Sequence, residues 1–199
     1  LHPLARDGAE HAALPPWVGE LADVPTIYLT LGTSFNVRSR DLFAPIIAGL
    51  RDLPITLVVT VGRNVDPVEF GAQPPNVHIE RYIPQSLLLP HCDLVVLHGG
   101  SGSVMGALAH GLPLVVVPLG ADMPLNAARC AALGVGRVID VGDVTPQSVR
   151  TAVEAVRADQ TYRTSAERMR DEIAALPGPE HAVMLLERLA AEKRPLLAD

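Results

Sequence analysis

The sequence predicts an α/β fold: a doubly wound, Rossmann-like parallel sheet of about six strands, with helices on both faces and a helical C-terminus. Two features predict it. Short aliphatic runs alternate with segments of helical spacing up to residue 145, and the spacing is helical after that. Strands that alternate with helices are typical of parallel sheets covered on both faces. Hydrophobic residues make up 48% of the chain and aromatic residues only 4%, so we expect an aliphatic core.

The expected elements follow one another in a regular order. Strands are expected where unbroken aliphatic runs end at turn-forming residues, at residues 27–31, 55–61, 77–82, 93–97, 112–118 and 136–141. Helices are expected where apolar residues recur every three or four positions, at residues 41–50, 104–111, 125–133, 146–158, 161–175 and 180–192. Pro177-Gly178-Pro179 separates the last two helices.

The first residues differ in character from the rest. Residues 1–24 are polar and are interrupted by Pro15-Pro16, so we expect an entry linker there and a domain over residues 25–199. An isolated Trp17 in the linker could dock on that domain. The chain begins with a leucine rather than a methionine, which we interpret as the sign of a fragment or a trimmed chain.

Charge and composition exclude several classes of function. A net charge of −6 with scattered arginines argues against nucleic acid as a partner, because phosphate backbones need clustered Lys and Arg. No apolar run is long enough for a transmembrane segment and no signal-peptide pattern opens the chain, so a cytoplasmic protein is expected. Cys92 and Cys130 are expected to be buried free thiols. No metal-ligand spacing is present, so neither a metal nor a cofactor is expected.

The most informative segment is His98-Gly99-Gly100-Ser101-Gly102-Ser103, which lies between two very apolar runs. Its glycines allow a sharp turn from a strand into a helix and let a ligand approach the backbone closely. Amides at a helix N-terminus favour an anion, so a phosphate group is expected. The segment lacks the lysine of a Walker loop, so amides, serine hydroxyls and the His98 ring would be the donors. A turn that merely lets the helix pack close to the sheet is the alternative.

Small and polar residues follow five of the expected strands. They are Gly32-Thr33-Ser34, Gly62, Tyr82-Ile83-Pro84-Gln85, residues 98–103 and Gly120-Ala121-Asp122. In doubly wound sheets the ligand binds outside the carboxyl ends of the strands. The shared edge therefore favours a ligand site over a purely structural turn.

The stretch from Tyr82 to Asn126 resembles the donor-binding signature of nucleotide-sugar-dependent glycosyltransferases of the glycosyltransferase-B fold, in the branch that modifies antibiotics and other secondary metabolites. The matching motifs are Tyr82-Ile83-Pro84-Gln85, residues 98–103, Gly111-Leu112-Pro113, and Asp122-Met123 with Asn126. Their order and spacing agree over about a quarter of the chain. The resemblance implies the C-terminal, donor-binding domain of such an enzyme.

The resemblance implies roles for the residues that would hold the nucleoside and the sugar. Tyr82 would stack on the nucleobase, the Ile83 backbone would bond to its edge, and Gln85 would reach the ribose. Asp122 would accept hydrogen bonds from sugar hydroxyls, with Met123 as a wall. Aromatic stacking suits a base and a carboxylate suits a sugar. Alternatively, Tyr82 is a half-buried strand residue and Asp122 caps the next helix.

The resemblance also implies how the diphosphate is bound. His98 would donate a hydrogen bond to a phosphate oxygen and stabilise the leaving diphosphate. The surrounding cradle would consist of Gly32, Thr33, Gly100, Ser101, Gly102 and Ser103.

Two departures from the signature bear on the donor. UDP-using members of the family usually have a glutamate, which binds both ribose hydroxyls, where this chain has Gly106. Losing that carboxylate suits a ribose without a 2′-hydroxyl. Met123 replaces an amide that would hold a sugar hydroxyl, which suits a deoxygenated sugar. Both changes favour a dTDP-deoxysugar over a UDP-sugar as donor.

The fold of this family has two domains, so the resemblance implies that an N-terminal acceptor domain carrying the catalytic base is missing here. We expect this chain to bind a donor but to transfer nothing alone. The complete enzyme would be inverting and metal-independent, with a small hydrophobic acceptor. Alternatives are a stand-alone nucleotide-sugar-binding subunit of a two-component glycosyltransferase, and an epimerase or a non-catalytic binding module of the same fold. The apolar stripe of the last helix (Val183, Leu186 and Leu189) is interpreted as core rather than as a surface for the absent domain.

Overall fold

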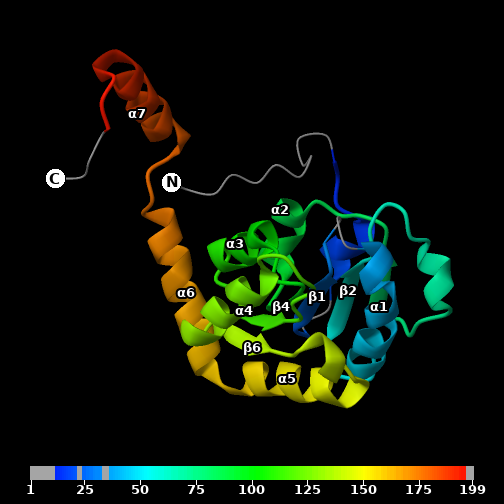
Figure 1. Ribbon diagram of the computed structural model, residues 1–199. Helices are drawn as coiled ribbons and strands as arrows, with labels where there is room; N and C mark the ends of the chain where they lie inside the picture. Colours follow the sequence, from blue (N-terminus) through cyan, green and yellow to red (C-terminus); the bar gives the residue numbers. More distant parts are fainter. Residues whose placement is uncertain (1–11, 22–23, 33–35, 196–199) are drawn as a thin grey trace.

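The computed structural model describes residues 12–21, 24–32 and 36–195, and it contains a six-stranded, all-parallel sheet (Figure 1). The strands are β1 (Thr26–Thr30), β2 (Thr56–Thr60), β3 (Val77–Glu80), β4 (Leu94–Leu97), β5 (Leu114–Val116) and β6 (Gly136–Val138). Their order across the sheet is β3-β2-β1-β4-β5-β6. The winding therefore reverses between β1 and β4, at the switch point where such sheets bind ligands. The predicted doubly wound α/β fold is confirmed.

The burial of the strands follows from their neighbours. The inner strands β1, β2, β4 and β5 are buried along their whole length, since helices cover both faces of the sheet and other strands lie on both sides. The edge strands β3 and β6 are partly exposed. In the parallel pairing of β1 with β4, Thr30 lies opposite Leu97. The residues that follow these two, on the loops after β1 and β4, consequently leave the sheet side by side.

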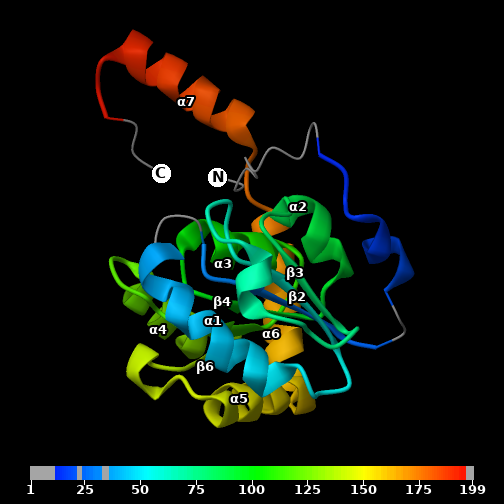
Figure 2. The ribbon, with the colours of Figure 1, turned by 90° about the vertical axis from the view of Figure 1, so that its right-hand side faces the viewer.

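Helices cover both faces of the sheet (Figure 2). One face packs Ile27 and its alternate neighbours against α1 (Asn36–Leu50) and α5 (Pro146–Ala158). The other packs Tyr28 and its alternate neighbours against four helices: α2 (Gln85–Leu88), α3 (Ser101–Ala109), α4 (Met123–Ala132) and α6 (Gln160–Ala174). The two cysteines are buried free thiols in this second layer, as expected. In the described part of the chain no helix has the length and apolar character needed to cross a membrane.

The differences from the predicted elements are confined to short segments and element ends. Helix α2 and the 3₁₀ turns are absent from the prediction; the turns lie at Pro16–Glu20, Pro67–Phe70, Leu89–His91 and Val141–Asp143. Segments of three to five residues are too short to show a periodic pattern. Helix α1 begins earlier than predicted, at Asn36, because its first turn carries too few apolar residues to extend the pattern.

Trp17 docks on the domain, as the sequence analysis allowed. Its indole stacks on the ring of His78 in β3, with ring centroids 4.0 Å apart and an interplanar angle of 9°. The indole Nε1 donates a hydrogen bond to Glu80 Oε1 at 3.3 Å. The indole therefore lies against β3, which is an edge strand of the sheet that the described residues form. Part of the segment expected to be a linker is thus attached to the domain.

The last helix, α7 (Pro179–Glu192), projects away from the sheet beyond the end of α6 (Figures 1 and 2). None of its residues is buried, and Val183, Leu186 and Leu189 are 54%, 63% and 42% exposed. The prediction that this stripe belongs to the core is therefore wrong. Apolar spacing shows that one face of a helix is suited to burial, but it does not show what covers that face.

The contact between α1 and α5 provides a test of the packing. A Cβ added to Gly49 would overlap the backbone carbonyl of Pro146, at the start of α5. We therefore expect Gly49→Ala to lower the free energy of unfolding by about 1–3 kcal/mol, although alanine is normally the better helix former by about 1 kcal/mol. Urea unfolding measures the change. Gly142→Ala, where an added Cβ meets nothing within 4 Å, is the control. A stabilised Gly49→Ala variant would contradict this packing.

Candidate functional site

The candidate site lies at the carboxyl edge of the sheet, where the loops after β1 and β4 meet. His98 follows β4, is only 7% exposed, and lies beside Gly32, which follows β1 with φ +76°. His98 Nε2 is 2.5 Å from the position that a Cβ would take on Gly32, and equally close to that position on Gly100. The imidazole is thus wedged between two residues that leave room for it only because they lack side chains.

The His98 ring combines burial with an unused polar atom. Burial lowers the pKa of His98, and the Thr30 backbone and the Asp122 carboxylate offset this only in part. The ring is therefore neutral at pH 7, with one nitrogen as donor and the other as acceptor. Its Nδ1 is buried and has no hydrogen-bond partner among the described residues. A buried polar atom without a partner is costly, so it marks a position where a ligand would be favourable.

Helix α3 presents its N-terminus beside this ring. Gly99 turns the chain with φ +84°, and Gly100 is the N-cap, with extended backbone and no side-chain cap on the first turn. The first turn carries Ser101 and Gly102, both exposed, and Ser103, which is half-buried. Its free amides and the positive end of the helix dipole favour an anion. The donors predicted from the sequence for a phosphate group therefore lie together.

The loop after β5 is tied to the same turn. Gly120 and Ala121 have φ of +154° and +53°, and Asp122 follows them, exposed, at the start of α4. Asn126 Nδ2 donates to the Gly99 carbonyl at 2.9 Å and to Asp122 Oδ2 at 3.1 Å. Asp122 makes no side-chain hydrogen bond to the helix amides, so capping does not account for its carboxylate. Met123 is buried, and its carbonyl lies 3.1 Å from the position of a Cβ on Gly99.

Gln85, at the start of α2, reaches towards α3. Its Nε2 donates to Ser103 Oγ and to the Tyr28 hydroxyl, both at 3.4 Å. Tyr28 is buried in β1 and shares a hydrogen bond of 2.7 Å with Thr60 Oγ1 of β2. Burial raises the pKa of Tyr28, so its hydroxyl stays protonated. Two buried strand residues thereby orient an amide that the sequence analysis assigned to the ribose.

The remaining predicted residues lie where β3 ends. Ile83 is buried, Tyr82 is half-buried, and the Arg63 guanidinium lies over the Tyr82 ring, with Cζ 4.3 Å from the ring centroid. Tyr28 and Arg63 are neighbours of the site that the sequence analysis missed. The only signal for Tyr28 in the sequence was a polar residue inside an apolar strand. The only signal for Arg63 was that it directly follows Gly62.

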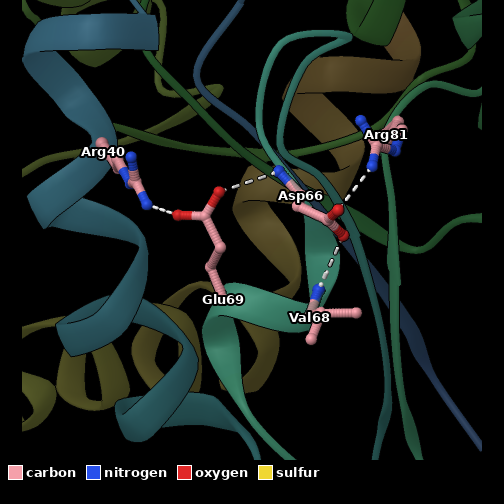
Figure 3. A network of polar contacts seen from close by, with 5 residues as sticks. All are labelled: Arg40, Asp66, Val68, Glu69 and Arg81. Carbon is pink, nitrogen blue, oxygen red and sulfur yellow. Dashed lines mark hydrogen bonds and ion pairs between the residues drawn. The ribbon is translucent and has the colours of Figure 1, made fainter.

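The β2–β3 loop that carries Arg63 is fixed by polar contacts (Figure 3). Asp66 accepts hydrogen bonds from the Val68 amide at 3.2 Å and from Arg81 Nη2 at 2.7 Å. Glu69 accepts from the Asp66 amide at 3.2 Å, and its other oxygen pairs with Arg40 of α1. The loop is therefore held both to α1 and to the end of β3.

The structure thus brings most of the predicted site residues to one edge. The His98 ring lies directly against Gly32 and Gly100, and Ser103 lies in the first turn of the helix that Gly100 caps. Hydrogen bonds connect Gln85 and Asp122 to this group. Tyr82 and Ile83 lie on the adjoining loop. Thr33 lies outside the described residues. Among the residues that the structure describes, no cluster of His, Cys, Asp or Glu could hold a metal ion.

Comparison with known sequences supports a common origin for this arrangement. A family model described as the C-terminal domain of erythromycin biosynthesis protein CIII-like proteins matches residues 45–189. The chain is 39% identical over 176 residues to 4'-demethylrebeccamycin synthase of Lentzea aerocolonigenes, covering 88% of this chain and 41% of that protein. It is 32% identical over 186 residues to 3-alpha-mycarosylerythronolide B desosaminyl transferase of Saccharopolyspora erythraea, covering 92% of this chain and 44% of that protein.

A solved structure is also similar to this chain. The structure of glycosyltransferase VinC in complex with dTDP superposes with a TM-score of 0.82 at 31% identity, over 95% of this chain and 47% of that chain. The chain therefore spans less than half the length of the relatives it matches here.

The buried His98 predicts how stability depends on pH. Because burial lowers the pKa of His98 below its ordinary 6.5, the unfolded chain takes up this proton first as the pH falls. The stability that neutral His98 contributes is therefore complete above about pH 6.5 and is lost as the pH falls towards the folded-state pKa. The pKa values of His78 and His110 are lowered too, so they contribute in the same direction.

We expect His98→Gln to reduce the loss of folding stability that occurs as the pH falls. Urea unfolding between about pH 5 and pH 7.5 measures it. The same substitution at the exposed His91 is the control. An unchanged slope in His98→Gln would mean that the ring is not held neutral by burial.

Proposed function

This chain belongs to the family of erythromycin biosynthesis protein CIII-like C-terminal domains, and we propose that it is the donor-binding half of a glycosyltransferase that transfers a sugar from a nucleoside diphosphate to a small natural-product acceptor. One observation carries the proposal: the neutral His98 ring, whose Nδ1 has no hydrogen-bond partner among the described residues, lies at the N-terminus of α3 beside the switch point of the sheet. That arrangement suits a diphosphate. Of the two relatives compared above, one is named as 4'-demethylrebeccamycin synthase and the other as a desosaminyl transferase.

In this proposal each loop binds one part of the donor. The α3 amides and His98 bind the diphosphate. Gly32 and Gly100, which lack side chains, let the diphosphate come close to the backbone. Gln85, oriented by Tyr28, reaches the ribose. Tyr82 and the Ile83 backbone take the nucleobase, and Asp122, oriented by Asn126, accepts hydrogen bonds from sugar hydroxyls.

The proposed reaction is a single inverting displacement. The acceptor oxygen attacks the anomeric carbon, and the bond from that carbon to the diphosphate oxygen breaks, leaving its electron pair on the phosphate. The acceptor proton goes to a base in the other half of the enzyme. The N–H donors of α3 and His98 stabilise the charge that develops on the leaving diphosphate, which is the task that a metal performs in other enzymes. We therefore propose metal-independent chemistry.

The structure adds a physical argument on donor choice. Gly106 lies in α3, and a Cβ added there would make ordinary contact with Leu89 Cδ1 at 3.5 Å. The space at the Cβ position therefore does not require glycine, so contacts at the Cβ do not account for the missing carboxylate. We propose that its absence favours a dTDP-sugar, and VinC was solved with dTDP.

The other half of the enzyme is part of the proposal. The chain covers 41–47% of the relatives compared, and α7 exposes Val183, Met184, Leu186 and Leu189. We propose that these side chains pack against an N-terminal acceptor domain, and that this chain alone is inactive. A cytoplasmic location also belongs to the proposal, because buried free thiols are typical of reducing compartments.

A thermal-shift titration with dTDP and UDP tests the proposed donor site. A ligand at about 100 times its dissociation constant stabilises the folded chain by about 2.7 kcal/mol, which raises the unfolding midpoint by about 5 °C or more. We expect dTDP to reach this shift at a lower concentration than UDP. A preference for UDP would keep the donor site but overturn the argument from Gly106. No response to either nucleotide would contradict the donor-binding function.

Gly106→Glu tests the cause of that preference. A carboxylate at this position is expected to accept hydrogen bonds from both ribose hydroxyls, raising the affinity for UDP relative to dTDP about tenfold, which is about 1.4 kcal/mol. Isothermal titration with both nucleotides measures the ratio. Ala131→Glu, which adds the same charge at an exposed position of α4, is the control. An unchanged ratio would show that this position does not select the ribose.

A further inference from the structure

Arg63 occupies a defined place at the edge of the proposed donor site. Its guanidinium Cζ lies 4.3 Å from the centroid of the Tyr82 ring, and the side chain is exposed. The backbone around it is fixed: the Gly62 amide donates to the Arg81 carbonyl at 3.0 Å, and the Val65 amide donates to the Gly62 carbonyl at 3.2 Å. Gly62 has φ +94°, and the turn that it makes in the chain directs Arg63 towards Tyr82.

The other arginines of this loop region have carboxylate partners, whereas Arg63 has none in the part of the chain that the structure describes. Arg81 pairs with Asp66 and Arg40 pairs with Glu69 (Figure 3). Within the described ranges Arg63 has no ion pair, and its guanidinium lies over the face of Tyr82. Its guanidinium plane therefore remains available for stacking by a ligand.

We propose that Arg63 forms the second wall of the nucleobase site, so that the base lies between the Tyr82 ring and the Arg63 guanidinium. This inference rests on the donor-binding function proposed above. Unpaired bases stack on aromatic rings and on arginine guanidinium planes alike, because both are flat and polarisable. The loop after β2 thus provides one wall, and the loop after β3 provides the other.

The movement that this requires is confined to one side chain. Stacked planes lie about 3.5 Å apart, so a base between the two groups needs the guanidinium to withdraw by roughly 3 Å. The cation–π contact that is given up is weak at an exposed position. The loop backbone need not move, since Asp66 and Glu69 hold it at the other end. The guanidinium covers the ring until a base takes its place and then stacks on the outer face of that base.

The test compares Arg63→Ala with the parent chain in isothermal titrations of dTDP, UDP and inorganic pyrophosphate. We expect the dissociation constants of dTDP and UDP to rise about tenfold, since stacking does not distinguish the two bases, and that of pyrophosphate to change less than twofold. Arg63→Lys keeps the charge but not the plane, and it should resemble Arg63→Ala. Arg168→Ala, another exposed arginine, on α6, is the control. An unchanged unfolding midpoint without ligand shows that the variants are folded.

The outcomes separate this inference from the proposed function. If the parent binds dTDP and Arg63→Ala binds it equally well or more tightly, Arg63 is no wall of the site, and the donor function stands. Equal losses for dTDP and pyrophosphate would also overturn the inference, because Arg63 would then act by its charge on the diphosphate. A parent chain that binds pyrophosphate but not dTDP or UDP would overturn both proposals.

Discussion

The site depends on one steric constraint: the His98 ring fills the space between Gly32 and Gly100, where no Cβ fits. The parallel pairing of β1 with β4 brings these two loops together, because Thr30 and Leu97 are in register and the loops begin directly after them. The position of the ring then fixes the turn into α3. Gly99 accepts a hydrogen bond from Asn126, so α4 and Asp122 are located relative to the same turn. A methyl group at either glycine would displace the ring on which this arrangement is built.

The sheet supports the site by means of a division between its two faces. The core of the α1/α5 face consists mainly of aliphatic side chains, together with Phe43. The other face contains Tyr28, whose hydroxyl is directed between strands to Thr60 and Gln85. In a close-packed interior such a network is favourable only when its members are satisfied, and Tyr28 and Thr60 satisfy one another before Gln85 joins them. Gln85 is therefore oriented in the absence of a ligand, which lowers the entropy that binding would cost.

Periodicity and local motifs were sufficient to predict most of the fold. Long aliphatic runs identified the six strands, and α5 has the same bounds as predicted, since Thr145 and Pro146 are strong signals for a helix start. The signature from Tyr82 to Asn126 predicted the loops that form the candidate site. Contacts between residues far apart in the sequence were not predictable. The stacking of Arg63 on Tyr82 and the orientation of Gln85 by Tyr28 depend on which loops the sheet order brings together, and residue spacing holds no information on that.

Helix α7 shows where the same reasoning reaches its physical limit. The apolar residues of α5 and α7 have similar spacing, yet α5 buries Val149, Val153 and Val156 whereas α7 buries no residue. Covering a Leu or Val side chain fully stabilises by about 1.5–3 kcal/mol, so an uncovered stripe forgoes several kcal/mol. Large exposed apolar patches are rare on monomers and mark interaction surfaces. Since this chain covers less than half of the relatives compared, the surface that suits α7 belongs, on our proposal, to the half that carries the catalytic base. The helix that closes the donor domain would then also attach it to the domain that completes the active site.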